Sequence, residues 1–143
     1  MTHDFRTKFL KFASVLLIGV GLSFFLSLFS PLAHVLRLFL DLAYLPYDGT
    51  QSFASDEGRL LIAISGGLMT GWGVMFWLVT TRVYARDPEL GKALILPSII
   101  VWFVIDSAGS ILAGALFNTV MNAGFLIMFV VPVIGRATVA ARV

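Results

Sequence analysis

Four long apolar segments, separated by short polar stretches, dominate the pattern of hydrophobic and polar positions along this chain. They cover about residues 9–29, 59–82, 93–117 and 120–135. Each is long enough to cross a hydrocarbon layer of about 30 Å as an α-helix. The pattern therefore predicts an all-α membrane protein, a single domain over residues 1–143 in which four transmembrane helices form a bundle.

The composition supports the same environment. The chain is 59% hydrophobic and 13% charged, whereas soluble domains carry about 25% charged residues. It has no cysteine, which excludes disulfides, iron–sulfur clusters and thiolate nucleophiles. The net charge of +2 is spread over loops and forms no basic stripe of the kind that nucleic-acid-binding proteins carry. We therefore expect a lipid bilayer, and no nucleic acid, as the partner.

The first segment has some features of a secretory signal, because Arg6, Lys8 and Lys11 come at its start. Its apolar core of about 18 residues is longer than the 7–15 residues of a signal peptide. Pro31 also stands where a cleavage site needs a small residue. We expect the segment to be retained as a helix.

The basic residues predict the orientation of the chain. If the N-terminus is cytoplasmic, eight lysines and arginines lie inside and only Arg37 and Arg59 lie outside. Such a bias follows the positive-inside rule. We expect a bacterial inner (plasma) membrane, crossed four times, with both termini in the cytoplasm. The eight inner residues are Arg6, Lys8, Lys11, Arg82, Arg86, Lys92, Arg136 and Arg142.

Capping and helix-breaking residues predict the ends and bends of the later helices. Asp87 is expected to cap the third helix, with Pro88 at its first position. Gly135 is a suitable end for the fourth helix. Pro97 and Pro132 lie within the third and fourth helices, where each removes a hydrogen bond and favours a kink.

A short amphipathic helix is predicted over about residues 31–45, between the first two spans. His34, Arg37 and Asp41 recur at helical spacing on one polar face, with apolar residues around them. The segment is too short to span a bilayer, so it would lie flat on the outer surface. Alternatively, it packs over the outer ends of the other helices, and the two arrangements are compatible.

Asp106 is the main candidate for chemistry, because it lies near the predicted midplane of the third span. No basic side chain is expected at that depth, and hydrocarbon favours the neutral acid there. Thr70 and Trp72 of the second span, and Ser110 on the same helix, are expected at a similar depth. Asp106 is then either a hydrogen-bonding group that joins helices or a site that binds a proton or cation during transport.

Small residues predict where the helices pack closely. Gly67 and Gly71 lie four apart on the second span, and Asp106, Ser110 and Gly114 have the same spacing on the third. Close backbone approach through such residues holds helices together in lipid. We expect Gly67, Gly71 and Gly114 to pack within this chain, with packing against a partner or a second copy as the alternative.

Asn118 and Asn122 are one helical turn apart, near the connection between the last two spans. We expect them to cap helix ends at the outer surface. A polar cluster with His34 is the alternative.

Several chemistries find no support in the sequence. The two histidines, His3 and His34, lie outside the predicted spans, where they could not ligate a transmembrane haem. No HExxH, GxSxG or P-loop motif occurs, and no metal-ligand spacing is present. We therefore expect no catalytic, cofactor-binding or metal-binding residues, no cofactor and no enzymatic activity.

The stretch "GGLMTGWG" on the second span resembles small bacterial four-helix membrane proteins of the DoxX-like kind. The resemblance covers one helix and implies a four-helix bundle, without assigning a role to any residue. The first functional hypothesis is a non-enzymatic accessory, assembly or subunit protein that acts through helix packing with another membrane protein or itself. The alternative is a small proton-coupled transporter or channel that uses Asp106.

Overall fold

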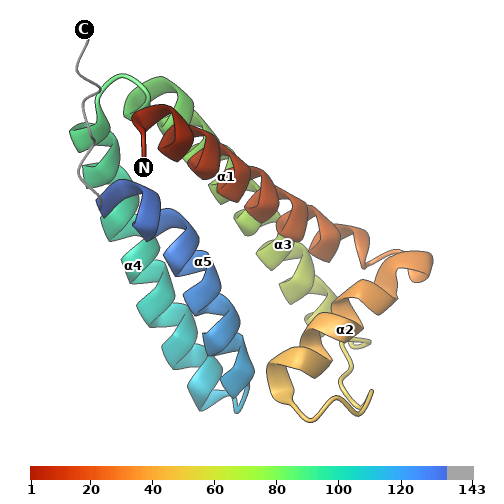
Figure 1. Cartoon of the computed structure of the whole chain (residues 1–143). Helices are drawn as coiled ribbons and strands as arrows, with labels where there is room; N and C mark the ends of the chain where they lie inside the picture. Colours follow the sequence, from red (N-terminus) through yellow and green to blue (C-terminus); the bar gives the residue numbers. More distant parts are fainter. Residues whose placement is uncertain (135–143) are drawn as a thin grey trace, which may run out of the picture.

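A computed structural model describes residues 1–134 of the chain, which form an all-helical structure (Figure 1). Helix makes up 83%, and no strand occurs among the described residues. Four of the described helices are long and apolar enough to cross a membrane, as predicted: α1, α3 together with its extension η2, α4 and α5. In chain order the elements are α1 (His3–Leu26), η1 (Ser30–Leu32), α2 (Ala33–Tyr44), α3 (Asp56–Leu78), η2 (Val79–Tyr84), α4 (Pro88–Leu112) and α5 (Leu116–Ile134).

The first two spans begin several residues before their apolar segments. The Thr2 side chain accepts a hydrogen bond from the Phe5 N–H and caps α1. Ser55 accepts from the Gly58 N–H and caps α3. A capping side chain fixes the start of a helix whether or not apolar residues follow at once, so the predicted starts at residues 9 and 59 were late.

The last two spans meet at a turn that the sequence analysis placed too far along the chain. α4 begins at Pro88, and Asp87 accepts from the Leu90 N–H, which confirms the predicted cap. α4 ends at Leu112 because Gly114 adopts a positive φ of 79°, which reverses the chain. α5 therefore begins at Leu116. The predicted stop at Gly135, like the charges of Arg136 and Arg142, lies outside the described residues.

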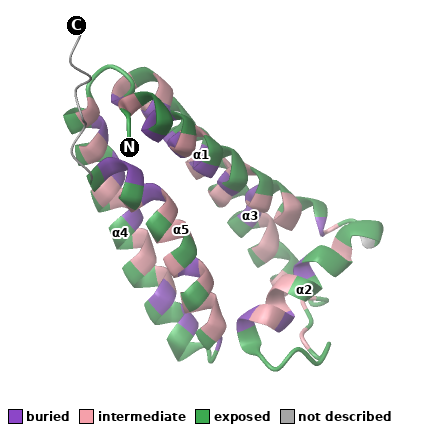
Figure 2. Ribbon diagram, viewed as in Figure 1, coloured by how far each residue is buried: buried purple, intermediate pink, exposed green. Residues whose placement is uncertain are grey.

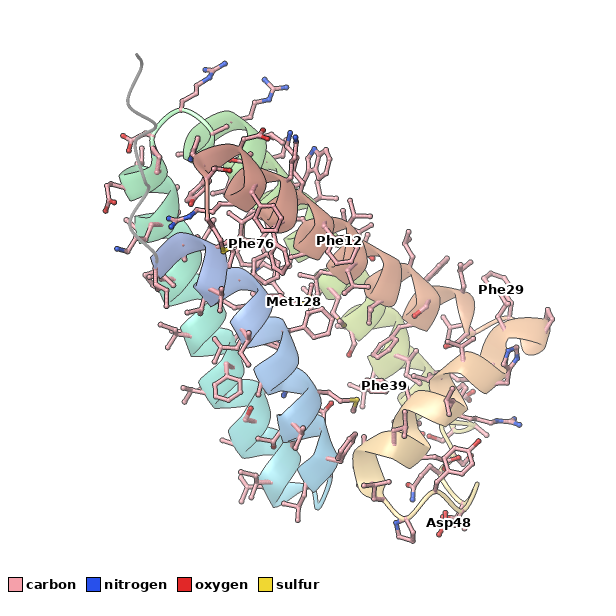
Figure 3. All side chains as sticks on the ribbon, viewed as in Figure 1. Phe12, Phe29, Phe39, Asp48, Phe76 and Met128 are labelled. Atoms are coloured by element: carbon pink, nitrogen blue, oxygen red, sulfur yellow. The ribbon has the colours of Figure 1, made fainter. Side chains whose placement is uncertain are left out.

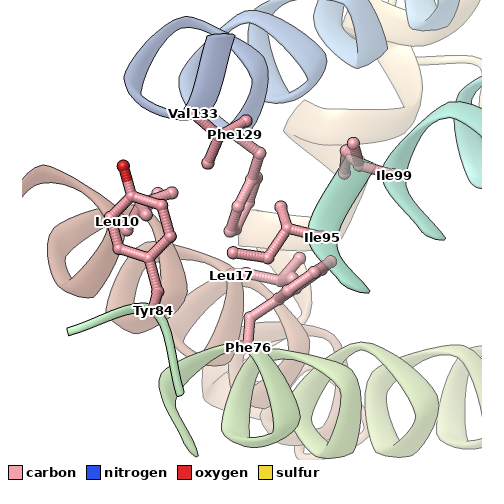
Figure 4. Close-up of a cluster of buried hydrophobic side chains, with 9 residues drawn as sticks. Leu10, Leu17, Phe76, Tyr84, Ile95, Ile99, Phe129 and Val133 are labelled. Carbon is pink, nitrogen blue, oxygen red and sulfur yellow. The ribbon is translucent and has the colours of Figure 1, made fainter. Parts of the chain in front are cut away.

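The helices form two pairs, α1 with α3 and α4 with α5. The pairs converge at the end where the chain begins and separate toward α2 (Figure 1). Buried side chains at the converging end join the pairs into one core (Figure 4). The core residues are Leu10, Ala13, Leu17, Phe76, Tyr84, Ile95, Ile99, Phe129 and Val133.

A short π-helix, η2, continues α3 at this converging end. The N–H of Ala85 bonds to the carbonyl of Thr80, five residues back, as π-helical geometry requires. Tyr84 closes the segment, and its buried hydroxyl donates to the Pro132 carbonyl of α5 at 3.0 Å. The π turn therefore positions a residue that ties the two helix pairs together.

Backbone contact between α1 and α3 depends on glycines other than the predicted ones. A Cβ at Gly66 would lie 2.8 Å from the Gly21 carbonyl oxygen, and one at Gly21 would lie 2.5 Å from the Thr70 nitrogen. A Cβ at Gly67 or Gly71 would meet nothing within 4 Å. The prediction that Gly67 and Gly71 pack within the chain is wrong, because neighbouring residues on a helix point about 100° apart and Gly66 takes the face toward α1.

Gly114 likewise has no packing role between helices. It lies in the exposed turn between α4 and α5, where a positive φ is needed and no neighbour lies within 4 Å of a Cβ position. Its predicted place on a small-residue face of α4 is wrong because the helix has already ended at Leu112. A glycine there serves the turn, since left-handed backbone is strained for other residues.

α2 packs across the wide end of the molecule, in contact with α5 and α1. The rings of Phe39 in α2 and Phe24 in α1 lie 5.0 Å apart. Asp41 is only 4% exposed, whereas His34 and Arg37 are exposed. Asp41 comes seven residues after His34 and therefore lies on the same side of α2, as its spacing predicts. It is buried because the C-terminal end of α2 lies beside the α4–α5 turn, whereas the earlier part of that side remains exposed.

Large apolar side chains cover the outside of the spans. Only 17% to 28% of the most apolar 18-residue window of each span is buried, and exposed positions follow the outer faces of the helices (Figure 2). Leu68 and Ile105, for example, are 70% and 68% exposed. Helices that expose apolar residues in this way are suited to lipid and not to water.

Candidate functional site

Asp106 accepts hydrogen bonds from two asparagines of the neighbouring helix. Nδ2 of Asn122 donates to Oδ2 of Asp106 at 2.5 Å, and Nδ2 of Asn118 lies 3.4 Å from the same oxygen. Asn118 also donates to the Ser110 hydroxyl oxygen at 2.8 Å. Asp106, Ser110, Asn118 and Asn122 therefore form one polar network between α4 and α5, called here the Asp106 network.

The hairpin geometry explains why these residues meet. Asp106 and Asn122 lie at equal distances in sequence before and after Gly114, and so do Ser110 and Asn118. In two antiparallel helices joined by a tight turn, residues equally far from the turn lie at the same level, because each helix rises by the same amount per residue. On each helix the two residues are four apart in sequence, so they lie one helical turn from each other on the same face of that helix.

Serine hydroxyls complete the surroundings of Asp106. Ser110 Oγ donates to the Asp106 backbone carbonyl at 2.7 Å, so its remaining lone pair accepts from Asn118. Ser107 Oγ lies 3.5 Å from Asn122 Nδ2. Ser107, Ser110 and Asn122 are buried, while Asp106 itself is half-buried.

No cation neutralises Asp106 within residues 1–134. The ion pairs found in that range join Lys8 to Asp4 and Lys92 to Glu89, both at the opposite end of the spans. Both amides donate to Oδ2, and no hydrogen bond in the described chain reaches Oδ1. One carboxylate oxygen is thus held by the protein, and the other is available to a ligand.

A cavity of about 750 Å³ lies between the two helix pairs, and Asp106 is part of its wall. All five α-helices contribute to the lining, which is apolar except where Asp106, Asn118, Asn122 and Ser65 reach it. Its volume is in the range of cavities that hold small organic ligands. The other lining residues are Leu17, Val20, Phe24, Phe39, Gly67, Leu68, Met69, Gly71, Trp72, Met75, Trp102, Met121 and Phe125.

A second hollow of about 430 Å³ lies between α3 and α4, and Asp106 lines it as well. Its other lining residues are Trp72, Ser98, Val101, Trp102 and Ile105. Val101 and Ile105 are strongly exposed on the outside of α4. Asp106 therefore borders the central cavity and also a hollow on the outer surface of the molecule, between α3 and α4.

Aromatic rings separate the Asp106 region from the buried core. Trp72 and Trp102 face each other across α3 and α4, with ring centroids 5.3 Å apart. Trp72 also lies 4.9 Å from Phe76, which belongs to the core. Figure 3 marks Phe76 toward the packed end and Phe39 of α2 near the other end. The cavity thus occupies the wide half of the molecule.

The structure brings some of the predicted partners of Asp106 to it and not others. Ser110 lies beside it, but its hydroxyl bonds the Asp106 backbone carbonyl and not the carboxyl group, to which it is joined through Asn118. Trp72 lines the same two hollows, and its Nε1 donates to Ser98 Oγ at 3.4 Å. Thr70 does not: its hydroxyl donates to the Gly66 carbonyl, and its backbone adjoins Gly21 of α1. Equal depth does not imply contact, because Thr70 faces α1, its partner helix in the same pair, and not α4.

Asp106 does not lie at the middle of α4. α4 covers Pro88–Leu112, so its centre is residue 100, and Asp106 lies six residues, or about 9 Å, farther toward the α4–α5 turn. Asp106 therefore lies halfway between the middle of α4 and its C-terminal end. This follows from the early end of α4 at Gly114.

Sequence reasoning missed the asparagines as partners of Asp106. Asn118 and Asn122 were expected to cap helix ends, or to join His34, but both lie within α5 and bind Asp106. His34 is exposed on α2. The signal that identifies the partners is their mirror-image spacing about Gly114, which becomes visible only when that glycine is taken as the turn.

Comparisons with known proteins leave the site to be interpreted from its own geometry. The chain matches no family model, no curated protein and no solved structure. In the part of the chain that the structure describes, no group of three or more histidine or acidic residues is arranged to hold a metal ion.

Proposed function

We propose that this chain is a non-enzymatic membrane protein that binds a small molecule with an apolar body and one cationic group. The proposal places four spans in a bacterial inner membrane, with both termini in the cytoplasm and α2 at the outer surface. The eight-to-two bias of basic residues supports this orientation. The resemblance of the α3 sequence to DoxX-like proteins remains a prediction, because the chain matches no family model.

One observation carries the proposal: Asp106 lines a large, mostly apolar cavity and has no cationic partner among the described residues. A carboxylate in apolar surroundings is costly unless a cation or hydrogen-bond donors compensate it. The two asparagine amides supply donors to Oδ2 only. A ligand cation at Oδ1 would complete the compensation, while Trp72 and Trp102 would contact its apolar body.

Intramembrane acids mark ion pathways and proton relays. Proton-coupled exchange would require a proton and the organic cation to compete for this one carboxylate. The hollow between α3 and α4 offers a route from the bilayer to Asp106. We therefore favour the transporter hypothesis over helix packing as the main role of Asp106.

Binding of tetraphenylphosphonium to the purified protein in nanodiscs tests this function. The unmodified chain should bind the cation, and Asp106→Asn, which keeps a hydrogen-bonding group, should weaken binding at least tenfold, or about 1.4 kcal/mol. Asp48→Asn changes an exposed loop acid outside the cavity and should bind as the unmodified chain does. Equal binding by Asp106→Asn, or no binding by the unmodified chain, would refute the proposal.

Filling the cavity gives an independent test. Gly71→Leu adds a side chain where no atom lies within 4 Å of the Cβ, and Gly71 lines the cavity. Gly19→Leu is the matched control, because that glycine is equally unobstructed and lies outside the cavity. Loss of binding is expected in Gly71→Leu and not in Gly19→Leu.

The open glycines also favour a second candidate function, an accessory or subunit role through helix packing. Gly67 and Gly71 carry no neighbour within 4 Å of a Cβ position, and both line the central cavity, so the backbone of another helix could approach them from the open side of that cavity. Since the chain has no cysteine, Gly67→Cys introduces one thiol whose oxidation would link two copies in the membrane. A dimer with Gly67→Cys and none with Gly19→Cys would support self-association.

A further inference from the structure

A separate pocket lies at the wide end of the molecule, away from Asp106. Its volume is about 220 Å³, and it lies between the end of α1, the start of α2 and the segment that leads into α3. Arg37 of α2 and Arg59 in the first turn of α3 both line it. The remaining lining residues are Ser27, Leu28, Ala33, Ser52, Phe53 and Ala54. We call it the two-arginine pocket.

Within residues 1–134, neither arginine forms an ion pair, although acids lie near both in sequence. Asp41 follows Arg37 by one helical turn, and Asp56 and Glu57 precede Arg59, yet none is within 4.0 Å of a guanidinium nitrogen. No acid is among the lining residues. Two positive charges therefore share a small concave site without a counter-charge from the described part of the chain.

Contacts within the protein fix the position of one arginine and leave a hydroxyl available. Nη2 of Arg59 lies 3.5 Å from the Leu28 carbonyl oxygen at the end of α1. Ser52 Oγ accepts from the Ala54 N–H at 3.3 Å, so its proton can be donated to a ligand. The pocket thus combines two guanidinium groups with one hydroxyl donor.

We propose that the two-arginine pocket binds the phosphate group of an anionic lipid. Guanidinium groups match tetrahedral oxyanions with paired, charge-assisted hydrogen bonds. A pocket of this size suits a phosphate group, and the rest of a lipid would lie outside it.

The surroundings favour a lipid as the source of the phosphate. Phe29 and Leu32, in the connection between α1 and α2, are large apolar residues that remain exposed, and Figure 3 shows Phe29 projecting beside that connection. A lipid whose headgroup entered the pocket could lay its acyl chains along such residues. In the proposed orientation, Arg37 and Arg59 are the two outer basic residues, so both lie where headgroups are found. Free phosphate, which offers the same oxyanion, is the competing source.

Native mass spectrometry of the full chain, released from detergent with added dioleoyl phosphatidylglycerol, tests the site. The unmodified chain should retain a lipid, and the double variant Arg37→Gln/Arg59→Gln should retain it at least tenfold less. Arg82→Gln/Arg86→Gln removes two arginines from the opposite end and should bind as the unmodified chain does. Retention by Arg37→Gln/Arg59→Gln equal to that of the unmodified chain would overturn the proposal.

Three further measurements keep the result interpretable. Arg59→Lys preserves the charge but loses the forked donor geometry, so it should reduce retention several-fold even if the double variant folds poorly. Inorganic phosphate at millimolar concentration should not displace the lipid; displacement would assign the pocket to free phosphate and overturn the lipid source. Asp106→Asn should retain lipid normally, so the test is independent of the proposed cation site.

Discussion

Asp106 and Asn122 lie at mirror positions about Gly114, and the Asn122 amide donates to Oδ2 of Asp106 across the α4–α5 hairpin. The contact ties an acid in the third span to an amide in the fourth. Any movement of α5 relative to α4 therefore changes the donors that Asp106 receives.

The first prediction concerns the strength of this contact. Asn122→Leu removes a buried donor that serves Asp106 and Ser107, and should lower the free energy of unfolding by about 1–2 kcal/mol. Asn118→Leu removes a 3.4 Å contact to Asp106 and a 2.8 Å contact to Ser110. It should cost less because Asn118 is only half-buried and other groups can replace its amide. Thermal unfolding of both variants in detergent measures the difference. A larger loss for Asn118→Leu would contradict the network as described.

Neighbouring glycines of α3 provide the second prediction. A Cβ at Gly66 would lie 2.9 Å from the Phe25 nitrogen as well as close to Gly21, so Gly66→Ala should destabilise by about 1–3 kcal/mol through overpacking. Gly67→Ala meets nothing within 4 Å and should stabilise by about 0.5–1 kcal/mol, because alanine favours helix. The midpoints of thermal unfolding should shift in opposite directions. Similar shifts would mean that α1 does not pack on the Gly66 face.

The third prediction tests the bond between the π-helix and the end of the fourth span. Tyr84→Phe removes the buried hydrogen bond to the Pro132 carbonyl and should cost about 1–2 kcal/mol, because the carbonyl loses its donor. Tyr47→Phe changes a tyrosine that is 64% exposed and should have no measurable effect. Chemical unfolding curves of the two variants provide the comparison, and equal stabilities would show that the bond is not needed.

The fourth prediction concerns the loop between α2 and α3. The hydroxyl of Thr50, together with its backbone N–H, donates to Asp48 and lowers the pKa of that exposed carboxyl below its ordinary value. Because the folded pKa is lowered, the turn is stabilised above the ordinary pKa of aspartate, about 3.9. That stabilisation is lost as the pH falls through the lowered pKa.

Thr50→Val removes the hydroxyl and leaves the backbone donor, so the pKa of Asp48 should rise part of the way to its ordinary value. An NMR titration of the Asp48 carboxyl carbon measures the change. Ser52→Ala alters a neighbouring hydroxyl that contacts Ala54 and should leave the titration unchanged. An unaltered pKa in Thr50→Val would show that the hydroxyl does not bind the carboxylate.

The number of apolar spans and the cap at Asp87 could be predicted because each depends on residues close together in the sequence. Segment hydropathy identifies a span, and an aspartate before a proline identifies a helix start. The starts of α1 and α3 depend on the capping residues Thr2 and Ser55, which lie outside the apolar segments.

The packing faces and the partners of Asp106 could not be predicted in the same way. Gly66 and Gly67 are equally small, and only the position of α1 decides which of them is covered. Asn118 and Asn122 reach Asp106 because the chain turns at Gly114, several residues before the apolar segment ends. An error in the position of one turn therefore changed the expected position of Asp106 along its helix and concealed its neighbours.

The uneven distribution of the core has a mechanical consequence. Because buried contacts join the two helix pairs mainly at one end, each pair can tilt as a rigid body about that end. A slight tilt at the pivot is magnified over a helix length of about 30 Å. The distance between α3 and α4 beside Asp106 should therefore change with the thickness of the surrounding bilayer. Spin labels on α3 and α4, in lipids of different chain length, would measure that distance.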